Sequence, residues 1–192
     1  MDIELVIVSP LTRALQTASL AFEGCNVSFL VTPLAREQLY SSCDIGRAGC
    51  ELGLEFPHLS DQLHSLPPQW WGGPDASTVH EQGRVLGTQR EQLLSVRQRL
   101  NGLAELIQTR KETRIAVVAH GVYFQQMLGR WLDNCEMVPL NLINGAICAC
   151  QGRMCTCQTV PGAPVSSQTG QTESALTSAL ETAAATADDG NT

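Results

Sequence analysis

Two segments of the 192-residue sequence place side chains that can bind an anion directly after an apolar run. In residues 9–13 (Ser-Pro-Leu-Thr-Arg), Arg13 falls at the start of an expected helix, where a planar fork of donors and a helix N-terminus both favour phosphate. Later in the chain, His120 can stabilise charge on a phosphoryl group, and Gly121 leaves room for a ligand to approach the main chain. These residues predict a phosphate-binding site.

Each side chain also has an ordinary structural interpretation. Arg13 taken alone is a solvated residue of a first helical turn, and His120 taken alone caps the helix that follows it. The two segments together favour a site, because each follows an expected strand of one parallel sheet. In such a sheet, ligands bind beyond the carboxyl ends of the strands.

The elements around these segments alternate between strand and helix. Apolar β-branched runs predict strands buried on both faces, and helical spacing without Gly or Pro predicts helices. The strands are expected at residues 3–8, 27–31 and 115–119, the helices at residues 12–22 and 122–132, and a hairpin at residues 143–160. This order predicts an α/β fold, a three-layer sandwich with a mostly parallel sheet.

Two further segments lie between these elements. Residues 34–74 are rich in Pro and Gly and predict a long irregular excursion, with Trp70-Trp71 stapling it to the core rather than lining a pocket. A long amphipathic helix is then expected to open at His80. Its apolar stripe recurs every seven residues, at Leu86, Leu93, Leu100 and Ile107.

Composition excludes several classes of function. Apolar residues make up 43% of the chain and charged residues 16%, which is typical of a soluble globular protein. The net charge of −7 argues against nucleic acid or an anionic membrane surface as a partner. No run approaches the ~18 apolar residues of a membrane span, and no signal peptide follows Met1, so a cytoplasmic protein with reduced thiols is expected.

Four of the eight cysteines are clustered near the C-terminus. They are expected on one face of a hairpin, at Cys148, Cys150, Cys155 and Cys157. Four thiols can bind zinc or oxidise, but structural zinc sites prefer Cys-x2-Cys spacing, and cysteine is more often a small core residue. No metal and no cofactor are therefore predicted, and a small zinc-binding protein is kept as an alternative.

Residues 9–18 resemble the second signature of the histidine phosphatase superfamily, and residues 118–121 resemble its late His-Gly signature. A third series is similar to the phosphoglycerate-mutase-like branch of that family. It consists of Arg36-Glu37, residues 43–47 (Cys-Asp-Ile-Gly-Arg), Phe56-Pro57 and Trp70-Trp71. The resemblance covers residues 2 to about 150, in the order that the family shows.

The resemblance implies a cofactor-independent phosphatase acting on a small phosphorylated metabolite. In that family a histidine of an Arg-His-Gly motif attacks the phosphoryl group and becomes a phosphohistidine. Arg13 and His120 would complete the pocket for the phosphoryl oxygens, and Glu37 would protonate the leaving oxygen. A carboxyl group beside a phosphate can have a raised pKa, which suits that role.

The chain departs from the family pattern because it contains no Arg-His-Gly. A first strand and helix of roughly 30 residues are expected to be missing, with that strand next to residues 115–119 in the sheet. The remaining histidines, His58, His64 and His80, are expected at the surface. We therefore expect residues 1–160 to form an incomplete, N-terminally truncated histidine-phosphatase domain, and residues 161–192 a disordered Ser/Thr/Ala-rich tail.

Beside the zinc-binding alternative, two functions remain open at this point. One is a phosphomonoester phosphatase that is inactive as encoded, because its nucleophile is absent. The other is a non-catalytic protein that binds a phosphorylated ligand or regulates through it. The oligomeric state and the choice between phosphatase and mutase stay open as well.

Overall fold

The structure is a computed structural model, which describes residues 2–72, 79–81, 84–86, 91–143 and 146–148. Its strands are β1 (Leu5–Val8), β2 (Ser28–Val31), β3 (Val79–Glu81), β4 (Arg84–Leu86), β5 (Ile115–Val118), β6 (Asn141–Ile143) and β7 (Ala146–Cys148). Its α-helices are α1 (Thr12–Ala21), α2 (Gly49–Glu55), α3 (Ser60–His64), α4 (Leu93–Gln108) and α5 (Gly121–Leu128). Short 3-10 helices cover Pro33–Ala35, Ser42–Asp44 and Pro57–Leu59.

The central sheet has the strand order β2-β1-β5, with all three strands parallel. The apolar run of β1 lies in the middle, and all four of its residues are buried, as its sequence predicts. Val8 at the end of β1 pairs with Val31 on one side and with Val118 on the other. The three strands therefore end together, and the residues that follow them meet at one edge of the sheet.

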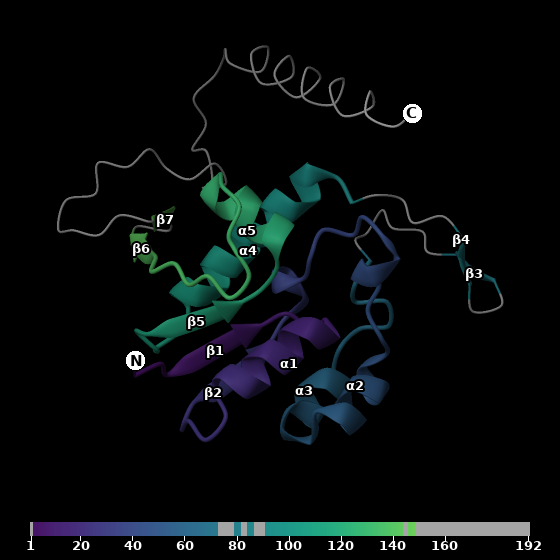
Figure 1. Cartoon of the computed structure of the whole chain (residues 1–192), viewed down its shortest axis with the longest axis horizontal. Helices are drawn as coiled ribbons and strands as arrows, with labels where there is room; N and C mark the ends of the chain where they lie inside the picture. Colours follow the sequence, from purple (N-terminus) through teal and green to yellow (C-terminus); the bar gives the residue numbers. More distant parts are fainter. Residues whose placement is uncertain (1, 73–78, 82–83, 87–90, 144–145, 149–192) are drawn as a thin grey trace, which may run out of the picture.

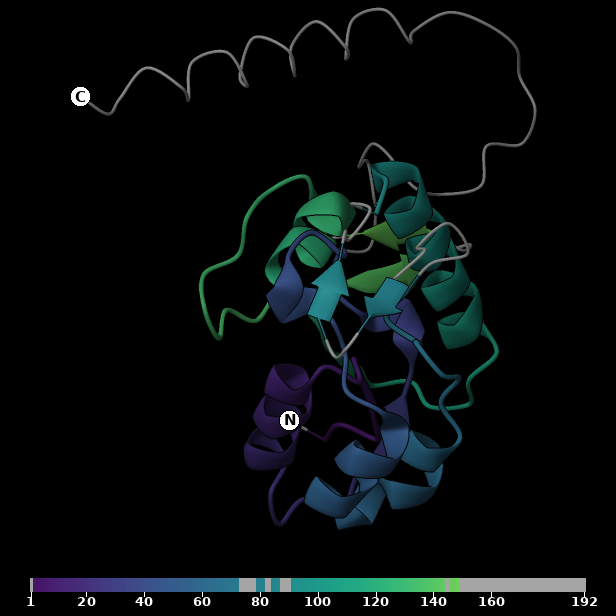
Figure 2. The same ribbon diagram turned by 90° about the vertical axis from the view of Figure 1, so that its right-hand side faces the viewer.

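Helices cover both faces of this sheet, which gives the predicted three layers (Figures 1 and 2). On one face Val6 and Val8 pack in a core with α1, α2 and α3. On the other face Leu5 and Ile7 pack in a second core with α4 and α5, and Tyr123 is its largest fully buried side chain. The alternation of side chains along β1 thus joins two hydrophobic cores, since successive residues of a strand point to opposite faces.

The segment after β2 contains more helix than its weak periodicity predicts. It contains α2 and α3, each of only one to two turns, which is too short for a helical repeat to stand out. Trp70 and Trp71 are only 4% and 7% exposed and lie in the core under this segment. The indole N–H of Trp70 donates to the carbonyl of Arg47 at 2.9 Å. The prediction that the two tryptophans staple the segment to the core is confirmed.

The predicted long helix is wrong in its first half. α4 begins only at Leu93, whereas His80 and Leu86 belong to the antiparallel pair β3 and β4. Glu81 pairs with Arg84, so the chain reverses between them, and Gly83 in that interval was the signal against a continuous helix. The second half of the stripe is correct, because the buried residues of α4 are Val96, Leu100, Leu103 and Ala104.

The structure shows a hairpin that starts earlier than the one predicted at residues 143–160, most of which lies outside the described residues. β6 and β7 pair antiparallel with Ile143 opposite Ala146, so the chain already reverses between these two residues. The Asn-Gly dipeptide at 144–145 is the strongest short signal for such a turn. Cys150, Cys155 and Cys157 lie outside the described residues, as does the predicted tail.

The β5 edge of the central sheet is open within the ranges that the structure describes. β5 pairs with β1, and no strand of those ranges occupies its other edge. The helices found there are all too short or too polar to cross a membrane. Cys25, Cys43, Cys50 and Cys135 are free, exposed thiols.

Candidate functional site

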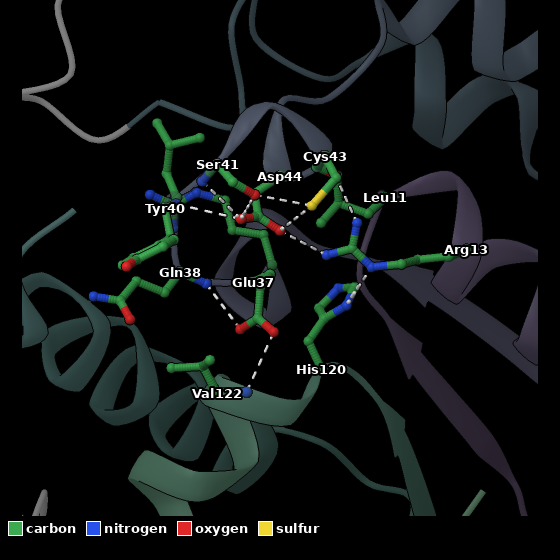
Figure 3. A network of polar contacts seen from close by, with 12 residues as sticks. Leu11, Arg13, Glu37, Gln38, Tyr40, Ser41, Cys43, Asp44, His120 and Val122 are labelled. Carbon is green, nitrogen blue, oxygen red and sulfur yellow. Dashed lines mark hydrogen bonds and ion pairs between the residues drawn. The ribbon is translucent and has the colours of Figure 1, made fainter. Parts of the chain in front are cut away.

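The parallel strands β1 and β5 bring the two predicted phosphate-binding residues into contact. Arg13 lies in the first turn of α1, and His120 is the residue before α5. The guanidinium Nε of Arg13 donates to the imidazole Nδ1 of His120 at 3.3 Å (Figure 3). Residues 107 positions apart in the sequence therefore share one site at the edge of the sheet.

Ser9 holds the other nitrogen of the His120 ring. Its hydroxyl lies 2.7 Å from Nε2, and both side chains are buried. Because Nδ1 accepts from Arg13, we assign the ring proton to Nε2, which then donates to Ser9. Burial, reinforced by the charge of Arg13, lowers the pKa of His120 to about 3, so the ring is neutral near pH 7 in this site.

Asp44 fixes the guanidinium of Arg13 from the opposite side. Its Oδ1 accepts from Nη2 of Arg13 at 2.9 Å, and Nη1 donates to the carbonyl of Cys43 at 2.7 Å. Asp44 is itself held, because its Oδ2 accepts from the backbone N–H groups of Tyr40 and Ser41. Three of the five guanidinium N–H groups of Arg13 are thus used, which leaves two for a ligand. A ligand can reach them, because the Arg13 side chain is 45% exposed.

Sequence reasoning missed the roles of Ser9 and Asp44. Both residues lie inside segments that the family resemblance quoted, yet neither was singled out. A signal for Asp44 was present, since Ser41 and Asp44 have the Ser-x-x-acid spacing of a capping box, and the structure shows that box. Ser9 offered no comparable local signal, because its partner is far away in the sequence.

Glu37 lies beside His120, at the N-terminus of α5 (Figure 3). Its carboxylate accepts from the backbone N–H groups of Val122 at 3.2 Å and Tyr123 at 3.0 Å. Burial raises the pKa of Glu37, with a smaller contribution from the charge of Asp44, against the lowering effect of the backbone donors. The carboxyl group thus retains a proton to higher pH than an exposed glutamate does.

A buried ionic cluster fixes the segment that carries Glu37. Arg36 donates to Glu91 at 2.8 Å, and Arg99 donates to both oxygens of Glu91, at 3.0 and 2.9 Å. Arg99 also donates to the carbonyls of Leu34 and Arg36. Through this side chain, α4 is hydrogen-bonded to the backbone on the N-terminal side of Glu37. Burial, with the like charge of Arg99, lowers the pKa of Arg36 to about 10, which leaves it charged at neutral pH.

The other histidines lie apart from this site. His58 is near Ser19 and packs edge-on against Phe29, and His64 is near Ser60. Both are exposed, which confirms their predicted surface positions. The side chain of His80 lies outside the described residues. No group of three or more His, Cys, Asp or Glu residues with metal-binding geometry is found within the described ranges.

Comparison with known proteins identifies the family. The model of the histidine phosphatase superfamily (branch 1) matches residues 1–152. Because this match covers most of the 192 residues, the chain belongs to the histidine phosphatase superfamily, as its signatures predict. Its parallel sheet between two helical layers is consistent with the phosphoglycerate-mutase-like fold.

No curated protein matches the chain. A similar solved structure is that of the "putative alpha-ribazole-5'-P phosphatase" of Escherichia coli strain K-12, substrain MG1655. The two chains are 20% identical and superpose with a TM-score of 0.37. The match covers 66% of this chain and 57% of that protein, so the chain spans little more than half of that protein's length.

Proposed function

We propose that this site binds the phosphoryl group of a small phosphomonoester through Arg13 and His120. The observation that carries the proposal is their direct contact at one sheet edge, with two guanidinium N–H groups of Arg13 left for a ligand. Gly121 is the exposed first residue of α5 and leaves room for a ligand beside His120, while Glu37 takes the N–H groups of Val122 and Tyr123 in the same turn.

We expect binding of a phosphoryl group to change the protonation state of His120. Nδ1 is the acceptor of the Arg13 hydrogen bond, and an acceptor nitrogen repels an anionic oxygen. A phosphate dianion beside the ring favours the imidazolium form, in which Nδ1 donates to the anion and the Nε–H of Arg13 turns from the ring to the anion as well. Ligand binding is therefore expected to be coupled to the uptake of a proton, and affinity should fall as the pH rises.

Glu37 is proposed as the proton donor to the leaving oxygen. Its raised pKa and its place at the first turn of α5 support this role. In the family reaction, a histidine nitrogen bonds to phosphorus, the ester P–O bond breaks and the leaving oxygen takes the acid's proton. Water then releases phosphate from the histidine.

Turnover by this route is not expected of the 192-residue chain. The sequence contains no Arg-His-Gly motif, and His58 and His64 lie elsewhere. By resemblance, the strand that bears the nucleophile would lie beside β5, whose second edge carries no strand within the described ranges. We therefore propose a phosphatase-type site that binds its ligand without hydrolysing it, in a cytoplasmic protein whose partner is a phosphorylated metabolite.

The test is calorimetric titration of the full chain with inorganic phosphate. Arg13→Gln is expected to weaken binding about tenfold or more, because hydrogen bonds to a charged group are lost. The matched control is Arg97→Gln, which removes an exposed arginine of α4. The proposal is wrong if wild type shows no binding at millimolar phosphate, or if Arg13→Gln binds as tightly as the control.

A hydrolysis assay decides between the two functions left open by the sequence. We expect no release of 4-nitrophenol from 4-nitrophenyl phosphate above the level of Arg13→Gln. Release that depends on Arg13 would show instead that the chain is an active phosphatase with another nucleophile.

A further inference from the structure

Trp131 differs from the other two tryptophans because its ring is exposed. Trp70 and Trp71 are buried and pack edge to face, with ring centroids 5.6 Å apart. Trp131 is 63% exposed, so most of its indole ring contributes nothing to a core. A single exposed apolar residue is common, and its meaning depends on where the ring lies.

The structure places the Trp131 ring at the N-terminus of α5. A Cβ atom added to Gly121 would lie 3.5 Å from Cζ3 and 3.9 Å from Cε3 of the indole, which is ordinary van der Waals contact. Since Gly121 follows His120 directly, the ring lies beside the first turn of α5 next to the phosphate site.

The chain after α5 is built to hold the ring there. Gly129 adopts a left-handed conformation with φ of 70° and ends the helix. Arg130 then forms an ion pair with Glu136 at 2.7 Å, and it also donates to the carbonyl of Trp131 at 3.1 Å. These contacts link the residues on both sides of Trp131, while the ring stays open to solvent.

The leaving group of a bound phosphomonoester would lie on this side of the site. Glu37, the proposed proton donor to the leaving oxygen, accepts from Val122 and Tyr123 in the same first turn. An ester oxygen within reach of Glu37 therefore lies near the start of α5, the same turn that Gly121 begins and that the indole borders.

We propose that Trp131 determines specificity by stacking on the ester group of the ligand, and that the site takes phosphomonoesters of planar, aromatic groups. This inference rests on the proposed function, because it assumes that the phosphoryl group binds at Arg13 and His120. A flat apolar ring gains from contact with an indole face, whereas a small polar or aliphatic ester does not.

The test compares the affinities of methyl phosphate and phenyl phosphate, which share the phosphoryl group and differ in the ester group. Wild type is expected to bind phenyl phosphate about tenfold more tightly, the gain of one aromatic stacking contact. In Trp131→Ala the ratio of the two affinities should fall toward one. The control Leu54→Ala removes another exposed apolar side chain, 83% exposed on α2, and should keep the wild-type ratio.

Fluorescence quenching by acrylamide gives an independent readout. Trp131 is the accessible tryptophan, so acrylamide should quench mainly its fluorescence. Phenyl phosphate should reduce this quenching, and methyl phosphate should reduce it much less. A wild-type affinity ratio near one, or a ratio of ten that survives in Trp131→Ala, would overturn the inference alone. Failure of wild type to bind either ester, or binding unaffected by Arg13→Gln, would overturn the proposed function and this inference with it.

Discussion

Replacement of Glu91 by alanine should be among the most destabilising single changes outside the apolar core. Glu91 is 8% exposed and accepts hydrogen bonds from Arg36, Arg99, Ser95 and the N–H of Leu39. Although burial opposes its charge, the bonds and charges of Arg99 and Arg36 lower the pKa of Glu91, so it is ionised at neutral pH. In Glu91→Ala the guanidinium of Arg36 would stay buried without an anion.

The size of the effect follows from that uncompensated charge. Removing one partner of a buried ion pair costs about 3–5 kcal/mol, and 1 kcal/mol lowers Tm by roughly 2–4 °C in a chain of this length. We therefore expect the Tm of Glu91→Ala to fall by about 6–20 °C. Thermal denaturation followed by circular dichroism measures the shift, and urea titration gives the corresponding free energy of unfolding.

A matched control is the exposed ion pair between Arg47 and Glu55. Their side chains are 43% and 36% exposed, so Glu55→Ala should cost no more than about 1 kcal/mol. If Glu91→Ala and Glu55→Ala change the free energy of unfolding equally, the buried cluster does not hold the segment of Glu37 as we describe.

Three further predictions concern other parts of the molecule. Ser9→Ala should lower the free energy of unfolding by about 1–3 kcal/mol, because the buried N–H of His120 loses its acceptor; the exposed Ser65→Ala should change it by less than about 0.5 kcal/mol. The pKa of His120 is lowered from 6.5 to about 3, so the unfolded chain binds a proton that the folded chain does not between these pH values. The free energy of unfolding of the ligand-free protein should fall as the pH drops through this range, and a pH titration of urea midpoints should show that His120→Gln removes this part of the dependence. Gly49→Ala should destabilise the protein, because its Cβ would lie 2.0 Å from the carbonyl oxygen of Leu63. In the control Gly102→Ala, in α4, the added Cβ meets a movable methyl group of Leu34 at 3.3 Å. The free energy of unfolding of this control, measured in the same assay, should stay within about 1 kcal/mol of wild type.

The central sheet and the meeting of Arg13 with His120 could be predicted from the sequence. β1 and β5 are continuous apolar runs, which favour parallel strands within a sheet; β1 is fully buried as predicted, whereas β5 is only half-buried. Once both strands lie in one parallel sheet, the residues after them must share an edge. Local pattern and topology agree here, and the prediction needed no side-chain detail.

The predictions of secondary structure were wrong where a local sequence pattern was compatible with two structures. The seven-residue recurrence of Leu86 and Leu93 looks helical, but Leu86 lies in β4 and Leu93 begins α4. The parts of the site that were missed depend on distant contacts: Ser9 reaches His120, and Asp44 reaches Arg13. Such contacts follow from the packed fold and cannot be read from spacing along the chain.

The most direct test of the account is the protonation state of His120 with and without phosphate, observed by 15N NMR of the imidazole nitrogens and assigned with His120→Gln. We predict a neutral ring at pH 7 in the free protein, with the proton on Nε2. Added phosphate should protonate Nδ1 as well, with a matching proton uptake in calorimetry. A His120 ring that keeps the same state while phosphate binds, or that is already charged in the free protein, would contradict the proposed site.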